Sequence, residues 1–447
     1  FLETVKPIPE IFQDVMTHLD YEEPLFHAMS FVSLPFLSKI RMFPGAFFFP
    51  PSIMLPLGNV NVIPVVVPKI IEAVFAQFVI YLFPIPIAKR EWLQTGFISY
   101  FADLIANKYF TNCFQPDKRW SDLNTLFVED IHQEVLLHST DPATGNPFQD
   151  EYLKIKAKLL INMLSQTMQN SETTLLMLMR KSLKNSEDKT DFFVQQFYDD
   201  LKKFSSLDFK KFNKQWLKSN GFPIFTFNFH VDKRQHNVKI ILYQRPSCNT
   251  KMDIFTGQIV AQLQDLKVLK NAPFSIVSKI QPQVIQFYAT RYKKKRENYT
   301  LQNLEQVQIE VKSALLWIAI DPKPTWICQV HACIPEHMLH HQIDLRRDAF
   351  VQHQLISDLC TYYANNQQTI DLFKTLLYNK QQDPNSQTRI VDYYYGVRCH
   401  AARALAKCDT EVNDHKHAGI LYNWYLEEFC ENKNKDCPKC HDFNDIP

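Results

Sequence analysis

The chain has 447 residues, of which 46% are hydrophobic and 21% are charged. These fractions exclude a wholly disordered chain, and at roughly 100–200 residues per domain the length allows about two to four domains. The 49 basic and 47 acidic residues leave a formal net charge of only +2, which excludes nucleic-acid binding by bulk charge. The chain has only 8 glycines and neither of the glycine-rich phosphate-binding motifs, which argues against a glycine-cradled nucleotide.

The termini and the cysteines indicate a fragment from a reducing compartment. Ten cysteines are scattered along the chain, so no disulfide framework is expected. The chain begins Phe1-Leu2-Glu3 without a signal-peptide pattern, which predicts an internal fragment of a longer protein. The uncharged stretch of residues 73–88 contains Pro84 and Pro86 and is too short for a membrane span.

The first half of the chain is expected to be mainly helical after a proline-rich start. Residues 1–70 carry ten of the 25 prolines, which predicts extended segments and turns there. A buried helix is expected from Lys69 to a point before Pro84, and residues 115–150 are expected to form a loop. Amphipathic spacing predicts further helices over residues 90–108, 152–170, 172–184, 191–203 and 208–219.

At Phe222 the hydrophobic period changes from that of a helix to that of a strand. Alternating apolar residues over 225–231 and 238–242, separated by a charged turn, predict a β-hairpin. Further strands are expected within 254–269, 274–277, 284–287 and 314–320, which completes a small β-sandwich. After Pro335 the pattern is helical, and residues 396–405 match the V-R-x-x-A-x-x-A-L pattern of a HEAT-type inner helix, so more solenoid is expected to follow.

One segment is similar to the signature of a zinc-peptidase family. Residues 92–100 read W-L-Q-T-G-F-I-S-Y and closely resemble the W-L-N-E-G-F-A-S-Y signature of gluzincin aminopeptidases. The resemblance implies that Thr95 stands where the family has its third zinc ligand. At the family's spacing, Glu72 and Ala76 then stand at the two histidine slots and Ala73 at the general-base slot.

Two further family positions are also substituted. Residues 45–49 fit the G-A-M-E-N frame without its acidic anchor for the substrate amine. Residues 154–157 fit the Y-x-K-G/A frame, with Lys154 in place of the tyrosine that donates to the oxyanion. The resemblance therefore implies a retired active site without metal, cofactor, small-molecule substrate or enzymatic activity. An active zinc aminopeptidase with displaced ligands remains the alternative.

Four further stretches resemble a non-enzymatic branch of this fold, the TBP-associated factors of the general transcription factor TFIID. They are residues 214–221 (K-Q-W-L-K-S-N-G), 316–322 (L-W-I-A-I-D-P), 347–352 (R-D-A-F-V-Q) and 395–407. The chain departs from that pattern at Ala319, where those factors have arginine. The resemblance does not extend to their N-terminal β-domain or to most of their solenoid.

The resemblance implies an α+β multidomain protein with a scaffolding function. An inactive, helical, thermolysin-like aminopeptidase domain is expected over 1–221, a β-sandwich over 222–334 and the start of a HEAT/ARM-type α-solenoid over 335–447. The implied function is that of a non-catalytic scaffold in RNA polymerase II pre-initiation complex assembly and core-promoter recognition in the nucleus. The implied partners are other TFIID subunits, including their tail peptides, and core-promoter DNA, with no membrane.

A basic run could contact DNA directly. It consists of Arg291, Lys293, Lys294, Lys295 and Arg296, and it falls where the TBP-associated factors carry a basic insertion. The run fits DNA phosphates, a nuclear import signal or a solvated loop, and the sequence does not choose among them. A protein that binds DNA directly through this loop is therefore a second alternative function.

Three other clusters have simpler interpretations. Cys430, Cys437, Cys440 and His441 have the form of a haem or zinc motif but are interpreted as helical-repeat surface. His337 and His341 lie one helical turn apart but lack an adjacent glutamate, so they are interpreted as cap or interface histidines. The lysines between 202 and 218 are interpreted as a solvated helix face.

Overall fold

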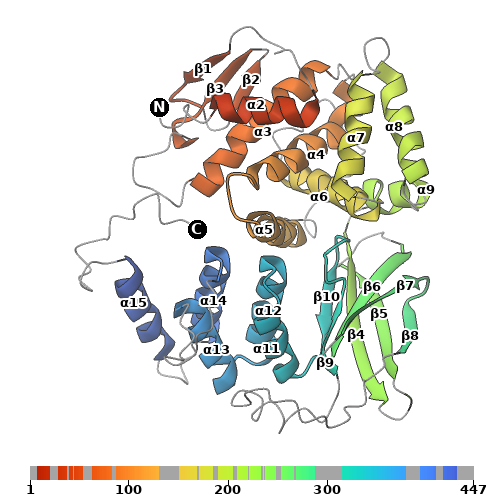
Figure 1. Ribbon diagram of the computed structural model, residues 1–447, viewed down its shortest axis with the longest axis vertical. Helices are drawn as coiled ribbons and strands as arrows, with labels where there is room; N and C mark the ends of the chain where they lie inside the picture. Colours follow the sequence, from red (N-terminus) through yellow and green to blue (C-terminus); the bar gives the residue numbers. More distant parts are fainter. Residues whose placement is uncertain are drawn as a thin grey trace, which may run out of the picture. The chain divides into compact units, whose positions relative to one another are not determined.

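The computed structural model describes two compact units (Figure 1), one that runs to Asn220 and one that begins at Gly221. The described residues are 8–20, 29–37, 40–43, 45–53, 63–82, 87–129, 151–168, 171–184, 190–204, 209–219, 221–232, 235, 237–247, 253–265, 268–286, 315–378, 393–408 and 416–429. No helix among them is long and apolar enough to cross a membrane.

The first unit is mainly helical and carries one small sheet. The strands are β1 (Ser30–Ser33), β2 (Arg41–Phe43) and β3 (Ala46–Phe49), in the order β1-β3-β2. The helices are α2 (Ile8–Leu19), α3 (Ile63–Leu82), α4 (Ile87–Ala106), α5 (Phe114–Glu129), α6 (Glu151–Thr167), α7 (Ser171–Lys184), α8 (Thr190–Phe204) and α9 (Phe209–Phe212), with a 3-10 turn η1 (Pro51–Ile53) and a π-turn η4 (Asn213–Leu217).

Two predictions for this unit are wrong in part. Where residues 1–70 were expected to be extended, α2 forms over Ile8–Leu19 and α3 begins at Ile63, so that it includes Pro64 and Pro68. Where 115–150 was expected to be a loop, α5 covers Phe114–Glu129. Each of these three helices has a proline within its first turn, where the backbone N–H needs no partner inside the helix. Pro68 lies further in and costs α3 one internal hydrogen bond.

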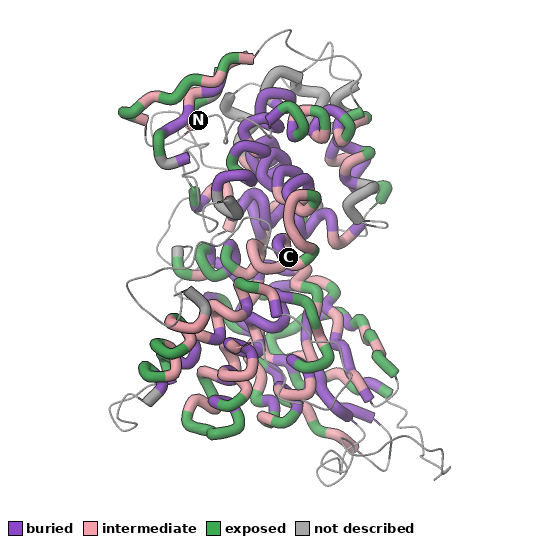
Figure 2. The backbone as a smooth tube through the Cα atoms, turned by 60° about the vertical axis from the view of Figure 1, so that its left-hand side comes forward, coloured by how far each residue is buried: buried purple, intermediate pink, exposed green. Residues whose placement is uncertain are grey.

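The core of the first unit lies where α4 packs against both α3 and α6 (Figure 2). Its buried side chains come from all three helices and include Ile70, Phe75, Phe78, Phe97, Phe101, Leu160 and Leu164. Gly96 of α4 faces the backbone of α6. A Cβ atom at Gly96 would lie 2.7 Å from the carbonyl oxygen of Ala157 and 2.7 Å from Cγ1 of Ile161. Glycine therefore permits the close approach of α4 to α6.

The second unit begins with two sheets and ends with helices. One sheet has the order β10-β4-β5-β8 and the other β7-β6-β9. The strands are β4 (Pro223–Asp232), β5 (Asn237–Pro246), β6 (Gly257–Asp265), β7 (Leu269–Ile276), β8 (Ile280–Gln286), β9 (Leu315–Ile320) and β10 (Gln329–Ala332). The helices are α11 (Glu336–Leu345), α12 (Ala349–Tyr362), α13 (Gln367–Tyr378), α14 (Tyr395–Cys408) and α15 (Lys416–Phe429).

The predicted hairpin is confirmed, because β4 and β5 pair antiparallel with Val231 opposite Val238. The rings of Phe225, Phe255 and Trp326 form successive edge contacts in the sandwich core, with centroids 5.6 Å and 5.0 Å apart. The buried Gln244 amide is satisfied because it donates to the Phe255 carbonyl and accepts from the Phe255 N–H, both at 3.0 Å.

One arginine joins the sandwich to the helices that follow it. The Arg346 guanidinium, just after α11, lies 5.7 Å from the ring centroid of Trp317 on β9. It also donates to Oε1 of Gln262 at 3.2 Å and to the carbonyl of Pro322 at 3.4 Å. Beyond this joint, α12 packs on α11 and α14, and α14 packs on α13 and α15. The continuation of these helices as a HEAT-type solenoid stays a prediction.

We expect Gly96→Ala to destabilise the first unit by about 1–3 kcal/mol, because the added methyl group must push α4 away from α6. The matched control is Gly419→Ala in α15, where a Cβ meets nothing within 4 Å. That variant should be neutral or gain up to about 1 kcal/mol from helix propensity alone. Chemical denaturation of both variants measures the difference, and an equal response would contradict the close contact.

Candidate functional site

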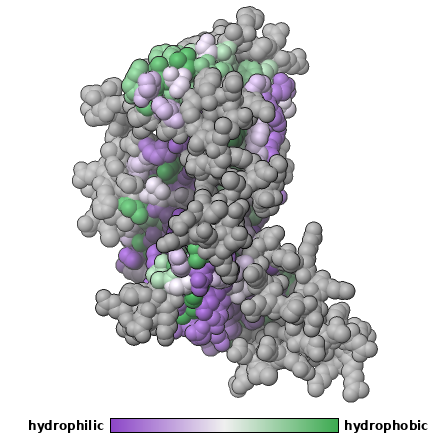
Figure 3. Space-filling model, turned by 90° about the vertical axis from the view of Figure 1, so that its left-hand side faces the viewer, coloured by the Kyte–Doolittle hydropathy of each residue, from purple (hydrophilic) through white to green (hydrophobic). Residues whose placement is uncertain are grey.

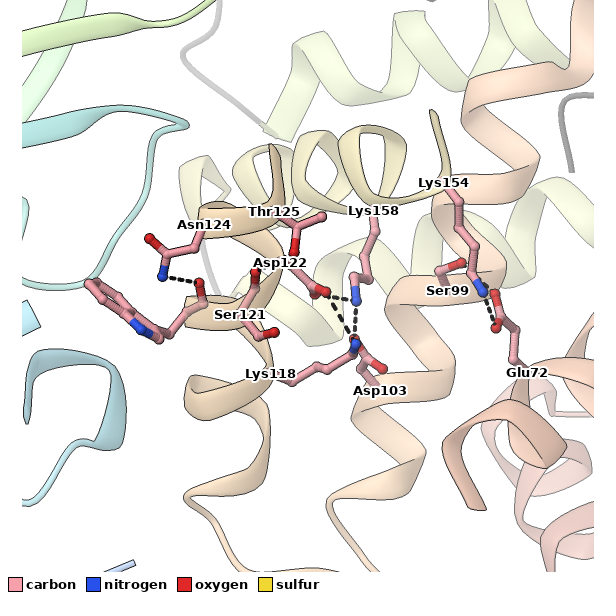
Figure 4. Close-up of polar contacts among 11 residues, drawn as sticks. Glu72, Ser99, Asp103, Lys118, Ser121, Asp122, Asn124, Thr125, Lys154 and Lys158 are labelled. Atoms are coloured by element: carbon pink, nitrogen blue, oxygen red, sulfur yellow. Dashed lines mark hydrogen bonds and ion pairs between the residues drawn. The ribbon is translucent and has the colours of Figure 1, made fainter. Parts of the chain in front are cut away.

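The structure brings together two of the substituted family positions on neighbouring helices (Figure 4). Nζ of Lys154 on α6 lies 2.6 Å from Oε2 of Glu72 on α3. The hydroxyl of Ser99 on α4 donates to Oε1 of Glu72, also at 2.6 Å. The Glu72 carboxylate is thus held by an ammonium and a hydroxyl from two different helices.

The two groups of this ion pair stabilise each other's charged forms. Burial raises the pKa of Glu72, but the Lys154 ammonium and the Ser99 hydroxyl outweigh it, so the pKa lies below its usual range. Burial lowers the pKa of Lys154, but the carboxylates of Glu72 and Glu151 outweigh it and the pKa is raised. Both side chains are therefore charged at neutral pH.

The remaining slots offer no ligand set for zinc. Ala73 and Ala76 are buried and have no donor atom. Thr95 is also buried, and its hydroxyl has no hydrogen-bond partner in the described structure. A catalytic zinc takes about three protein ligands from histidine, cysteine or carboxylate. Of these slots only Glu72 carries such a group, and Lys154 already neutralises it, so the residues do not fit a metal.

A second buried cluster lies one helical turn further along α6, and the sequence analysis missed it (Figure 4). Nζ of Lys158 lies 2.8 Å from Oδ2 of Asp103 on α4 and also pairs with Asp122 on α5. Lys118 of α5 adds a second cation 3.3 Å from Asp122. Burial raises the pKa of Asp122, but the two lysines outweigh it and the pKa is lowered. The available signal was the spacing of Lys154 and Lys158, which lie four residues apart on one face of a helix in which most residues are buried.

The G-A-F-F-F segment also lies against the former metal helix. Gln77 of α3 donates to the carbonyl of Phe43 at 2.8 Å and accepts from the N–H of Gly45 at 3.4 Å. Gly45 has a φ of 74°, which glycine adopts without strain. Phe47 and Phe49 of β3 are buried, so this segment supplies apolar packing where the family has an acidic anchor.

Two aspartates in the stretches that resemble the TBP-associated factors shape the backbone. Oδ2 of Asp321 accepts from the N–H groups of Thr325 at 3.0 Å and Trp326 at 3.1 Å, and its φ is 49°. Asp348 is the N-cap of α12, with Oδ1 accepting from the N–H of Val351 at 3.1 Å. The similarity in these stretches therefore reflects turns and helix starts.

The other predicted site residues fall into two groups. Arg291, Lys293, Lys294, Lys295 and Arg296 lie outside the described residues, as do Cys430, Cys437, Cys440 and His441. The rings of His337 and His341 on α11 lie 6.5 Å apart. Within the described ranges, no group of three or more His, Cys, Asp and Glu side chains is placed to hold a metal ion.

Two lysines of the predicted face, Lys202 and Lys203, lie in the last turn of α8, and their exposed ammonium groups form ion pairs. Lys202 lies 3.7 Å from Asp199, and Lys203 lies 2.9 Å from Asp200. Lys181 of α7 also reaches Asp200, at 2.9 Å. These contacts fit the interpretation of a solvated helix face.

The solved structure of aminopeptidase A from Legionella pneumophila, in complex with aspartic acid, shares the fold. The likeness covers 95% of this chain and 49% of that one, with a TM-score of 0.57 and 10% sequence identity. An aminopeptidase-like fold is thereby confirmed. At this identity the likeness concerns the fold alone.

Sequence comparisons point to one group of proteins. The family described as the TAF2 Ig-like domain matches residues 220–335. Transcription initiation factor TFIID subunit 2 of Schizosaccharomyces pombe is 21% identical over 433 residues, which is 79% of this chain and 35% of that protein. The Drosophila melanogaster protein of the same name is 22% identical over 209 residues, 46% of this chain and 16% of that protein.

The chain therefore spans about a third or less of the length of these relatives. The Danio rerio protein of that name is also similar, at 23% identity over 254 residues, 54% of this chain and 19% of that protein. Together these matches confirm the resemblance drawn from the sequence motifs: the chain is a relative of subunit 2 of the transcription initiation factor TFIID.

Proposed function

We propose that the chain is a non-catalytic scaffold region of a TFIID subunit 2, acting in RNA polymerase II transcription initiation. One observation carries the non-catalytic part. The Lys154–Glu72 ion pair joins the slots where gluzincin aminopeptidases have the catalytic tyrosine and the first zinc ligand. In this chain the Lys154 ammonium supplies the positive charge at these slots, whereas in the enzymes a metal ion supplies it.

The rival function, a zinc aminopeptidase with displaced ligands, lacks the groups it needs among the described residues. A zinc hydrolase needs a metal-bound water and a general base beside it. Ala73 offers no base, and the nearby carboxylates of Asp103 and Asp122 are paired with Lys158. The site would have to be rebuilt before it could activate water.

The scaffold function is supported by exposed apolar surface outside the sandwich. Val32, Phe36 and Phe43 are exposed on or next to the three-stranded sheet. Figure 3 shows hydrophobic side chains gathered at this end of the first unit. Exposed apolar surface of this kind is typical of protein–protein contacts. We propose that other TFIID subunits, in part through tail peptides, bind such surfaces in the nucleus.

Core-promoter DNA is a further proposed partner of the assembled complex. Arg291, Lys293, Lys294, Lys295 and Arg296 are the proposed phosphate contacts, on the strength of their sequence alone. Phosphate contacts of this kind would position the protein on DNA without reading its sequence.

We expect Lys154→Met to lower the free energy of unfolding by about 3 kcal/mol at neutral pH, because it leaves the Glu72 carboxylate without its counter-charge. The double variant Glu72→Met with Lys154→Met should recover most of that loss. The loss should shrink as the pH falls toward the ordinary glutamate value of 4.5, because without Lys154 burial raises the pKa of Glu72 and protonation removes the uncompensated charge.

Urea denaturation at several pH values measures this effect, and Lys202→Met, which breaks an ion pair exposed on both sides, is the matched control and should change little. In the wild type, the contribution of the Glu72 carboxylate to the free energy of unfolding should be lost as the pH falls through the lowered pKa of Glu72. A stability that rises with added zinc in wild type but not in Lys154→Met would contradict the proposal that the ammonium replaces the metal.

The scaffold function is tested by affinity purification of the full-length protein from nuclear extract, followed by mass spectrometry and metal analysis. We expect the TATA-binding protein and its associated factors in fixed proportion, and no stoichiometric zinc. Recovery of a lone protein that carries one zinc and cleaves aminopeptidase substrates would overturn both parts of the proposal.

A further inference from the structure

The outer face of the four-stranded sheet carries an apolar patch on β5 and β8. In the antiparallel register, Ile241 lies opposite Pro282, Tyr243 opposite Ile280 and Lys239 opposite Val284. Ile241, Ile280 and Val284 are 53%, 57% and 51% exposed. We call the residues Ile241, Tyr243, Ile280, Pro282 and Val284 the β5–β8 face.

This patch is not needed for the sandwich core. A half-buried antiparallel strand alternates apolar residues inward with polar residues outward. β4 follows this rule, with exposed Thr226, Asn228 and His230 on its outer side. On β5 the inward residues Val238, Ile240 and Leu242 are fully buried. The outward Ile241 and Val284 therefore add apolar surface that the fold itself does not use.

The charges around the β5–β8 face are mainly positive. β5 carries Lys239 and Arg245, and Nζ of Lys279 lies 5.5 Å from the ring centroid of Tyr243. The four strands of this sheet contain a single acidic residue, Asp232, which pairs with Lys239 at 3.8 Å. A partner that covers this face gains most when its apolar side chains are flanked by carboxylates.

The face is better suited to binding than the edge beside it. Strand β8 is the last strand of the sheet (Figure 1). Pro282 within it lacks the N–H that an added strand would need, and the Lys270 side chain donates to the Gln286 carbonyl. A proline on an edge strand opposes strand addition, and Lys270, which comes from β7 of the other sheet, already occupies one carbonyl of this edge. The exposed side chains of the β5–β8 face are therefore better placed to contact a partner than the backbone of β8 is.

We propose that the β5–β8 face docks an acidic segment of a partner protein that carries apolar side chains. The apolar side chains of the segment pack on Ile241 and Val284, and its carboxylates lie against Lys239, Arg245 and Lys279. This inference rests on the proposed scaffold function, because it names the chemistry of one partner of that scaffold.

The first test uses a fluorescein-labelled synthetic peptide in which leucine alternates with glutamate, and its twin with lysine in place of glutamate. We expect the full chain to bind the glutamate peptide and not the lysine peptide in fluorescence anisotropy. The variant Ile241→Asp with Val284→Asp should weaken binding by about tenfold or more. Ser275→Asp, at an exposed position on β7 of the other sheet, is the matched control and should bind as wild type does.

A charge-reversed variant keeps the test decisive if the apolar variant unfolds. Replacing Lys239, Arg245 and Lys279 with glutamate should abolish binding of the glutamate peptide and create binding of the lysine peptide. Equal affinity of wild type and both variants, or no binding to wild type, would overturn the proposal. The proposal would also be overturned if duplex DNA binds the wild type and binds the variant Ile241→Asp with Val284→Asp more weakly, because the face would then bind nucleic acid.

The second test places a photo-crosslinking amino acid at position 241 of the full-length protein in its purified complex. We expect crosslinks to an acidic segment of another polypeptide, whereas crosslinks to DNA or to another part of the same chain would overturn the proposal. Copurification of the TATA-binding protein reports separately on the proposed function. If the TATA-binding protein still copurifies but position 241 gives no crosslink, the docking proposal is overturned and the proposed function is not. If the glutamate peptide binds but no TFIID subunits copurify, the proposed function is overturned and the docking proposal is not.

Discussion

Two lysines one turn apart on α6 hold the helices of the first unit together. Lys154 reaches Glu72 on α3, and Lys158 reaches Asp103 on α4 and Asp122 on α5. Because these groups are largely removed from water, each charge needs its partner, and the loss of one member leaves a costly unpaired ion. The positions of α3, α4 and α5 around α6 are therefore fixed by charge as well as by apolar packing.

The packing of an aminopeptidase-like fold depends on positions other than those that the family uses for chemistry. Gly96 still allows α4 to approach α6, and Gln77 still joins α3 to the turn at Gly45. The likeness to the Legionella aminopeptidase, at 10% identity, shows that the fold tolerates wide replacement. Positions that set the distance between helices are constrained by sterics, because a close-packed interior tolerates little change in volume.

Local patterns predicted some of the fold, and the failures have a common cause. The β4–β5 hairpin followed from strict alternation around Phe225 and Ile240. α2 was missed because the prolines of residues 1–70 predict extended chain there, although the buried spacing of Ile11 and Val15 is helical. The Lys154–Glu72 pair joins residues 82 positions apart, and no local rule reports such a contact. The family motifs placed both residues at one site without indicating that they form an ion pair.

The Lys154–Glu72 pair also has an evolutionary consequence. A zinc site at these slots would require new side chains at residues 72, 73, 76 and 95, together with the loss of the lysine at 154. Replacing Glu72 first would leave the Lys154 ammonium without its carboxylate, and replacing Lys154 first would leave the carboxylate without its ammonium. Each first step lowers stability before any metal can bind, and a marginally stable protein tolerates few such steps. The ion pair therefore couples the two positions, so that a substitution at either one is tolerated best when the other changes with it.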